Sequence, residues 1–140
     1  MNTFNTGKVR FEYSPGWEAQ KANILSSPDC IATLSKGNHD LINIEMFPTL
    51  TNLKDYKRFM ENYISDDGGI ILSSDIVKIA DMDVIKLHAN MNTPRLKFDI
   101  HSLVFIENNE IFIFELRTSD KSGESENELK NIVSSFEILK

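Results

Sequence analysis

The chain has 140 residues, the length of one ordinary domain, and its formal net charge at pH 7 is −6. Hydrophobic residues make up 41% and charged residues 26%, which excludes a disordered chain, a collagen-like chain and a disulfide-stapled scaffold. Because an acidic chain repels phosphate backbones, we expect no nucleic-acid partner. The sequence therefore predicts a single globular domain over residues 1–140.

Cysteine content and hydropathy bear on the compartment. Cys30 is the only cysteine, so no intrachain disulfide can form, and its alternation with apolar neighbours predicts a small core residue. No apolar run approaches the length of a membrane span, and the polar first residues lack the apolar centre of a signal peptide. We expect no transmembrane segment and a cytoplasmic location, or an exported one if a leader precedes this sequence. The sequence does not specify an oligomeric state.

The first half of the chain predicts three strands and a helix. Strands are expected over residues 9–13, 30–34 and 42–47, where apolar and polar residues alternate. A helix is expected over residues 53–66, where apolar residues recur with a period of 3.6 and form one stripe. The members of this stripe are Leu53, Tyr56, Phe59, Met60, Tyr63 and Ile64. Thr51 or Asn52 can cap the helix, and the glycine pair at 68–69 can end it.

The second half predicts four more strands and a second helix. Four extended runs are separated by short turn signals, and strands joined so tightly must be antiparallel. These runs cover residues 70–80, 84–91, 96–106 and 111–118. The second helix is expected over residues 126–136, with Ser125 and Glu128 as a capping-box pair at its start.

Two of the predicted strands contain a run of four residues that is apolar at every position, which indicates the layering. Residues 103–106 read Leu-Val-Phe-Ile, and residues 111–114 read Ile-Phe-Ile-Phe. Such strands are covered on both faces, because leaving four large side chains in water would cost about 1.5–3 kcal/mol each. Two amphipathic helices are available as covers. The sequence therefore predicts an α+β fold, an α/β/α sandwich in which an antiparallel sheet of about six to seven strands carries one helix on each face.

Short motifs at both ends of the chain resemble those of a known superfamily. Residues 11–17 read Phe-Glu-Tyr-Ser-Pro-Gly-Trp, similar to the strand–proline–tryptophan opening of the PsbP-like superfamily. Residues 112–116, the helix that follows and residues 132–136 resemble its closing block. The helix containing Asp55 and Tyr56 stands where the superfamily has its first long helix. The resemblance spans nearly the whole chain in element order, and it implies an α/β/α sandwich with a curved antiparallel sheet.

The superfamily includes the PsbP proteins of photosystem II, the Ran-binding nucleotide-release factors, DcrB-type bacterial proteins and small prokaryotic members. These proteins share a fold but differ in function, and they act mostly by binding. The resemblance therefore implies a non-catalytic binding or adaptor module rather than an enzyme. In agreement, the sequence has no glycine-rich phosphate loop, no nucleophile elbow and no His-Glu-x-x-His motif. We expect the partner to be a protein or a small ligand.

One group of residues has the composition of a metal site: His88, Asp99 and His101. Alternation along the two predicted strands places the three side chains on one face. A turn centred at residues 93–94 would set His88 directly opposite Asp99, with Cβ atoms about 4.5–5.5 Å apart. Two imidazoles and a carboxylate could bind a divalent transition metal, the one cofactor that the sequence offers. A divalent-metal-dependent or small-ligand-binding protein is therefore the second hypothesis, set against a plain polar face with one weak His–Asp pair.

Aromatic residues are the other candidates for binding. Trp17 could anchor a partner, but its place directly after a tight turn favours burial against the sheet. Tyr56 and Tyr63 lie seven residues apart on the stripe of the first helix, so we expect both to pack in the core. The sequence therefore assigns no partner-binding residue.

Overall fold

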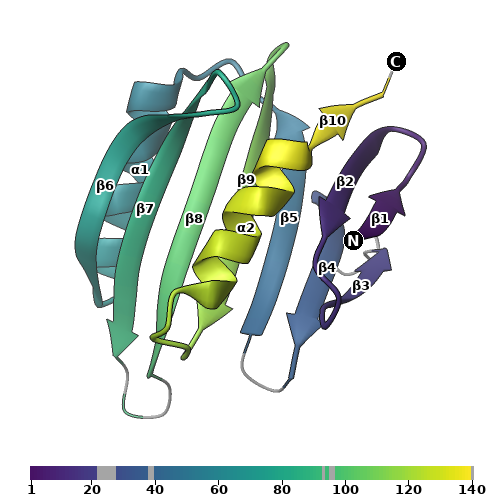
Figure 1. Ribbon diagram of the computed structural model, residues 1–140. Coiled ribbons are helices and arrows are strands. Elements are labelled where there is room, and N and C mark those ends of the chain that lie inside the picture. The colour runs from purple at the N-terminus through teal and green to yellow at the C-terminus, as the bar shows by residue number, and fades with distance from the viewer. Residues whose placement is uncertain (22–27, 38–39, 93, 95–96, 140) are drawn as a thin grey trace.

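The computed structural model describes residues 1–21, 28–37, 40–92, 94 and 97–139 (Figure 1). Within these residues lie two helices, α1 (Leu53–Asp66) and α2 (Glu124–Ser135), and ten strands. The strands are β1 (Asn2–Asn5), β2 (Val9–Tyr13), β3 (Glu18–Lys21), β4 (Cys30–Lys36), β5 (Asp40–Pro48), β6 (Gly69–Ile79), β7 (Met82–Asn92), β8 (Lys97–Glu107), β9 (Glu110–Thr118) and β10 (Glu137–Ile138).

Seven of the strands form one antiparallel sheet in the order β3-β4-β5-β9-β8-β7-β6, and the other three form a small sheet in the order β1-β2-β10. The hairpins β6–β7 and β8–β9 close through two-residue turns, at Ala80 and Asp81 and at Asn108 and Asn109. All four turn residues have positive φ, as a type I′ turn requires, and this turn has the twist that paired strands need. The predicted antiparallel sheet of up to seven strands is thereby confirmed.

The two helices cover opposite faces of the large sheet, so the predicted α/β/α layering is confirmed as well (Figure 1). On one side α1 runs along β6 and β7. On the other side α2 lies over β8 and β9 and also packs against β2 of the small sheet. Among the described helices, neither combines the length and the apolar character that crossing a membrane requires.

Each side of the sheet has its own hydrophobic core. On the α2 side, the ring of Phe136 lies edge-on to Phe105, Phe112 and Phe114, with centroids 5.1–6.0 Å apart. On the α1 side, Met60 and Ile64 pack over the buried face of β7 and β8. Residues 103–106 of β8 and 111–114 of β9 alternate between the two cores, which is the reason for these two unbroken apolar runs.

The start of α1 agrees with the prediction, but its apolar stripe is only partly buried. Asn52 caps the helix, and its side chain accepts a hydrogen bond of 2.8 Å from the Asp55 N–H. Tyr56 packs against the α1-side core as expected. Tyr63, in contrast, is 63% exposed and its neighbour on the stripe, Phe59, is 58% exposed, so the predicted core packing of Tyr63 is wrong. The stripe is wider than the contact that one helix makes with β6 and β7.

The predicted capping box of α2 is wrong, because both of its members are used elsewhere. The helix begins after Gly123, which has φ +85 and provides no side-chain cap. Ser125 Oγ donates instead to the buried Asp40 at 2.7 Å, and the Thr118 hydroxyl donates to the other oxygen of that carboxylate. A buried carboxylate requires such donors, and this one links β5, β9 and α2.

Glu128, the other member of the predicted box, ties α2 to the start of the large sheet. Its carboxylate accepts a hydrogen bond from Trp17 Nε1 and another from Lys36 Nζ at 2.8 Å. The ammonium group of Lys36 also lies 5.3 Å from the centroid of the indole ring. The hydrogen bond to Glu128 raises the pKa of Lys36. Trp17 is only 4% exposed, so its predicted burial is confirmed and it is not available as a surface anchor.

Candidate functional site

The three predicted metal ligands meet on the α2 side of the sheet, although their predicted register is wrong. In the β7–β8 hairpin, His88 lies directly opposite His101 and not opposite Asp99. The last pair before the loop is Asn92 with Lys97, so the hairpin is centred one residue later than predicted. Alternation fixes the face of each side chain, but an even shift of the pairing leaves every face unchanged. The shared face of the three residues was therefore predictable and the register was not.

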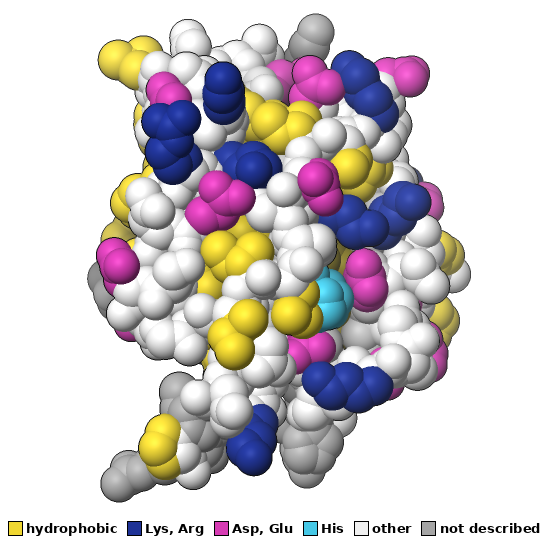
Figure 2. Space-filling view, turned by 90° about the vertical axis from the view of Figure 1, so that its left-hand side faces the viewer, with side chains coloured by type: hydrophobic (Ala, Val, Ile, Leu, Met, Phe, Trp, Pro, Cys, Tyr) yellow, Lys and Arg dark blue, Asp and Glu magenta, His cyan; other side chains and the backbone are white. Residues whose placement is uncertain are grey.

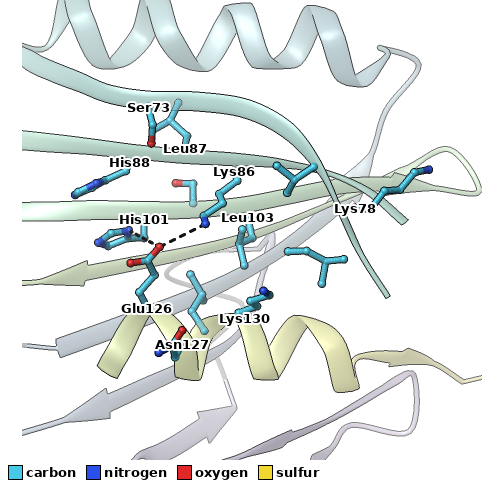
Figure 3. Close-up of a pocket in the computed structure, with 14 residues that line it drawn as sticks. Ser73, Lys78, Lys86, Leu87, His88, His101, Leu103, Glu126, Asn127 and Lys130 are labelled. Carbon is cyan, nitrogen blue, oxygen red and sulfur yellow. Dashed lines mark ion pairs between the residues drawn. The ribbon is translucent and has the colours of Figure 1, made fainter. Parts of the chain in front are cut away.

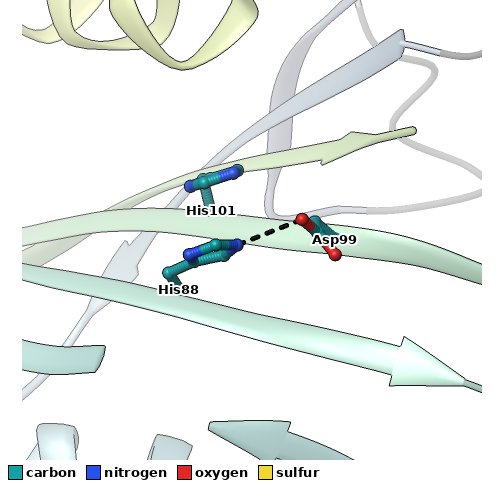
Figure 4. Close-up of side chains that lie close together, drawn as sticks. All are labelled: His88, Asp99 and His101. Atoms are coloured by element: carbon teal, nitrogen blue, oxygen red, sulfur yellow. Dashed lines mark hydrogen bonds and ion pairs between the residues drawn. The ribbon is translucent and has the colours of Figure 1, made fainter. Parts of the chain in front are cut away.

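His88, Asp99 and His101, here called the His–Asp cluster, lie close enough to share one ligand (Figure 4). His88 Nε2 is 3.2 Å from Asp99 Oδ2, and the two imidazole rings stack with centroids 4.1 Å apart and planes at 17°. One donor atom from each residue lies within 4.8 Å of the other two. The cluster therefore has the composition and the proximity of a three-ligand metal site.

The surroundings of the cluster favour an ionised carboxylate at Asp99 and a neutral imidazole at His101. Burial by itself raises the pKa of Asp99, but three polar neighbours outweigh it and lower this pKa to about 2. Those neighbours are Asn90 Nδ2 at 2.7 Å, Lys121 Nζ at 3.0 Å and His88 Nε2 at 3.2 Å. Burial, and then the proximity of His88, lowers the pKa of His101. A depressed pKa favours the neutral imidazole, the form that binds a metal.

A cavity of about 290 Å³ opens beside the His–Asp cluster, between α2 and strands β6 to β8 (Figure 3). His101 Nδ1 and Lys86 Nζ lie 3.9 and 3.8 Å from the same carboxylate oxygen of Glu126. Lys78 and Lys130 also line the cavity, so three lysines stand against one glutamate. The positive charge of this lining disfavours binding of a dication, whereas the negative charge of the ionised Asp99 favours it.

The ring geometry also determines what metal binding would require. The lone pair of an imidazole nitrogen lies in the ring plane, and two stacked rings whose planes are only 17° from parallel and whose centroids are 4.1 Å apart cannot both direct a lone pair at one ion. One ring must therefore rotate, and Lys121 must leave the Asp99 oxygen that it contacts. The side chain of His88 is 30% exposed and that of Lys121 is 71% exposed, so these are the two groups free to move. Binding of a divalent metal by the cluster would require both movements.

The opposite face of the sheet carries a groove that the sequence analysis missed. This α1 groove has a volume of about 440 Å³ and lies between α1 and strands β5, β7, β8 and β9. The sheet contributes apolar side chains, among them Ile100 and Ile113. The helix contributes Tyr56, Phe59 and Tyr63, whose neighbouring rings have centroids 5.6 and 6.2 Å apart. The aromatic residues of α1 thus form one wall of an open groove.

Charged side chains stand at the sheet side of the α1 groove and at the end of α1. They are Glu45 of β5, Glu115 and Arg117 of β9, and Asp67 at the end of α1. Along β9 the face that carries Ile111 and Ile113 continues with Glu115 and Arg117. This change from apolar to charged residues on one face is the sequence signal that could have revealed the groove. It marks the part of the sheet that α1 leaves uncovered.

The edge strand β6 adds a second apolar surface. Three of its large side chains, Ile70, Leu72 and Ile76, are exposed. Figure 2 faces the side of the molecule that β6 borders, and it shows apolar side chains gathered between charged ones. An edge strand also leaves one row of backbone N–H and C=O groups unpaired within the sheet. The largest exposed apolar residues of the described chain therefore lie mainly on α1 and β6.

The fold described above is PsbP-like, as comparison with solved structures shows. The solution structure of cyanobacterial PsbP (CyanoP) from Synechocystis sp. PCC 6803 matches with a TM-score of 0.71 at 12% identity, over 98% of this chain and 91% of that one. LpqN, a protein involved in cell envelope biogenesis of Mycobacterium tuberculosis, matches with a TM-score of 0.65 at 9% identity, over 99% and 90% of the two chains.

A crystal structure from Bacteroides thetaiotaomicron VPI-5482 matches with a TM-score of 0.65 at 15% identity. The match covers 94% of this chain but 45% of that longer one. No sequence family and no curated protein matches the chain. The predicted resemblance is thus confirmed for the fold, and at these identities the fold is what the comparisons show.

Proposed function

We propose that this protein is a non-catalytic binding module with a PsbP-like fold, and that it binds its ligand in the α1 groove. The observation that carries the proposal is the aromatic wall of the groove. Phe59 and Tyr63 lie on the stripe that should be core, yet more than half of each side chain is exposed. Exposed aromatic residues that line a concave surface are typical of sites that bind ligands or partners.

The size and composition of the groove support a small ligand. Pockets for small molecules commonly measure about 300–1,000 Å³ and combine apolar walls with a few polar groups. The α1 groove falls within that range at about 440 Å³. Its apolar surface comes from both α1 and the sheet, and its charged groups are confined to the sheet side and the end of α1. A ligand with an apolar body and a polar end matches this distribution.

The test is a screen by nuclear magnetic resonance of the ¹⁵N-labelled protein against a mixed set of small acids, amines, alcohols and neutral aromatic compounds. Binding should shift the amide signals of residues that line the α1 groove. Phe59→Ala and Tyr63→Ala should weaken the binding, whereas Leu50→Ala, which removes another highly exposed apolar side chain, should not. Shifts confined to other surfaces, or equal affinities of all three variants, would overturn the proposal.

A second candidate function is divalent-metal binding by the His–Asp cluster. The observation in its favour is that one donor atom from each of His88, Asp99 and His101 lies within 4.8 Å of the other two. If the cluster binds Zn²⁺, a hundredfold excess over Kd should stabilise the wild type by about 2.7 kcal/mol. His88→Ala should lose that gain. His39→Ala, which alters the remaining histidine of the sequence, is the matched control. Equal shifts in melting temperature for all three proteins would exclude this site.

A further inference from the structure

We infer that the ligand of the α1 groove is an organic ammonium ion, a positively charged amine attached to an apolar body. This inference rests on the proposed function, and it names the chemical class that the groove selects. Three features of the groove support it: the charged residues, the arrangement of the aromatic rings and the apolar side chains of the sheet.

The charged residues of the groove are unbalanced. Three carboxylates, those of Glu45, Asp67 and Glu115, face a single cationic side chain, Arg117. The guanidinium group of Arg117 is already engaged, because its Nε lies 3.4 Å from Glu115 Oε2 and its Cζ lies 5.5 Å from the centroid of the Phe98 ring. The groove therefore has an excess of negative charge that the guanidinium group does not balance.

Glu45 is the residue on which this excess is concentrated. Its side chain is half-buried, and among the described residues it takes part in no hydrogen bond or ion pair. Burial, and then the nearby charges of Glu115 and Asp29, raises the pKa of Glu45. Burial, followed by the charges of Glu45 and Glu115, also raises the pKa of Tyr56. A cation bound beside this carboxylate would offset the repulsion from its neighbours and the cost of burying its charge.

The aromatic wall suits the same kind of ligand. Tyr56, Phe59 and Tyr63 follow one another along α1, and each ring centroid is within 6.2 Å of the next. An ammonium group is attracted to the face of an aromatic ring, and the attraction adds to that of a carboxylate. Ile100 and Ile113 on the sheet side offer apolar contact to the rest of the molecule. The groove thus pairs a site for positive charge with a surface for hydrocarbon.

The occupant to which we commit is a small molecule. A volume of about 440 Å³ accommodates a compound of that size, and the carboxylates of Glu45 and Glu115 on the sheet face the aromatic rings of α1. Anionic compounds are disfavoured because Glu45 would repel them and because Arg117 already has two partners. Neutral compounds would gain the apolar contact alone.

The test compares three probes that share one aromatic body: phenethylammonium, phenethyl alcohol and hydrocinnamate. Each is titrated into ¹⁵N-labelled protein, and both the Kd and the shifted amides are recorded. Phenethylammonium should shift groove amides and bind at least about tenfold more tightly than the alcohol, since bonds to charged groups exceed neutral ones. Hydrocinnamate should bind more weakly than either.

Two isosteric variants make the test specific. Glu45→Gln should remove the tenfold advantage of phenethylammonium over the alcohol while leaving the affinity for the alcohol unchanged. Glu107→Gln lowers the net negative charge equally at an exposed hairpin residue outside the groove, and it should preserve the advantage. Loss of the advantage in both variants would reduce it to overall charge and overturn the inference.

The remaining outcomes separate this inference from the proposed function. Equal binding of the ammonium and the alcohol in the groove, or preference for hydrocinnamate, would overturn the amine class and leave the binding groove in place. Failure of all three probes to shift groove amides would also overturn the amine class. The proposed function would then depend on the broader screen, which contains compounds of other classes.

Discussion

Replacing Glu45 by Gln should stabilise the protein at neutral pH, because it removes one of two neighbouring negative charges from the same face of the sheet. Glu45 lies opposite Ile113 and Glu115 lies opposite Asn43, so the two glutamates are diagonal neighbours on adjacent strands. Such neighbours are about 7 Å apart. Their repulsion is about 0.6 kcal/mol in bulk water and about 2.4 kcal/mol at an effective dielectric constant of about 20.

The groove is half open, so a value between these limits applies, and Arg117 beside Glu115 reduces it further. Burial of the Glu45 carboxylate acts in the same direction as the repulsion. We therefore expect Glu45→Gln to raise the free energy of unfolding by about 1 kcal/mol at pH 7. For a chain of this length that gain corresponds to an increase of about 3 °C in melting temperature.

The pH dependence gives the prediction its sign. Because the pKa of Glu45 is raised in the folded protein, folding disfavours the ionised form, and the resulting penalty is present above that pKa. As the pH falls through the raised pKa toward the ordinary glutamate value of 4.5, the carboxyl group becomes protonated and the penalty disappears. Wild type and Glu45→Gln should therefore differ at pH 7 and agree near pH 4.

Urea denaturation followed by circular dichroism at both pH values measures the difference. Glu18→Gln, which changes the net charge in the same way at an exposed residue opposite Ser35, is the control and should stay within about 0.5 kcal/mol of the wild type. A lower stability of Glu45→Gln at pH 7 would refute the reasoning, because it would mean that the carboxylate has a stabilising partner in the folded protein.

Two further predictions concern the packing of the helices. Asp40→Ala should lower the free energy of unfolding by about 2–4 kcal/mol, because it leaves the buried hydroxyls of Thr118 and Ser125 without their acceptor. A loss below about 0.5 kcal/mol in urea denaturation would contradict that role. Met60→Ala should cost about 2–3 kcal/mol, whereas Phe59→Ala should stay within about 0.5 kcal/mol, since adjacent residues of α1 are buried and exposed respectively. The reverse order in thermal melts would show that the helix presents another face to the sheet.

The sheet was predictable because its sequence satisfies two constraints at once. Residues 103–106 of β8 and 111–114 of β9 are apolar on both faces, and the hairpin between them has two asparagines that tolerate the positive φ of its turn. Local alternation and turn chemistry agree there with the global layering. The second helix was also predictable from its stripe, but its start was not. Ser125 found a partner in Asp40, which is 85 positions away in the chain, and no local rule contains that contact.

The candidate sites also combine features that local sequence patterns predict with features that depend on tertiary contacts. The common face of His88, Asp99 and His101 follows from alternation, whereas the stacking of the two rings follows from a register that alternation leaves open. The α1 groove was missed because the stripe of α1 was read as wholly buried. A periodic stripe shows which residues share a side of a helix, but the width of the contact depends on what the helix packs against. Tyr63 belongs to the stripe and lies outside the contact.

The groove follows from the dimensions of the fold. A helix with its side chains is about 10 Å wide, which covers roughly two strands at a spacing of about 4.8 Å. The seven-stranded sheet is roughly 29 Å across at that spacing. On one face α2 and the small sheet share the covering, and the residues beneath them form one continuous core. On the other face α1 runs along β6 and β7, and the chain places charged residues on β5 and β9 where the cover ends. The α1 groove is the boundary between the covered and uncovered parts, so a ligand bound there would extend the apolar cover of the helix while meeting the carboxylates beyond it.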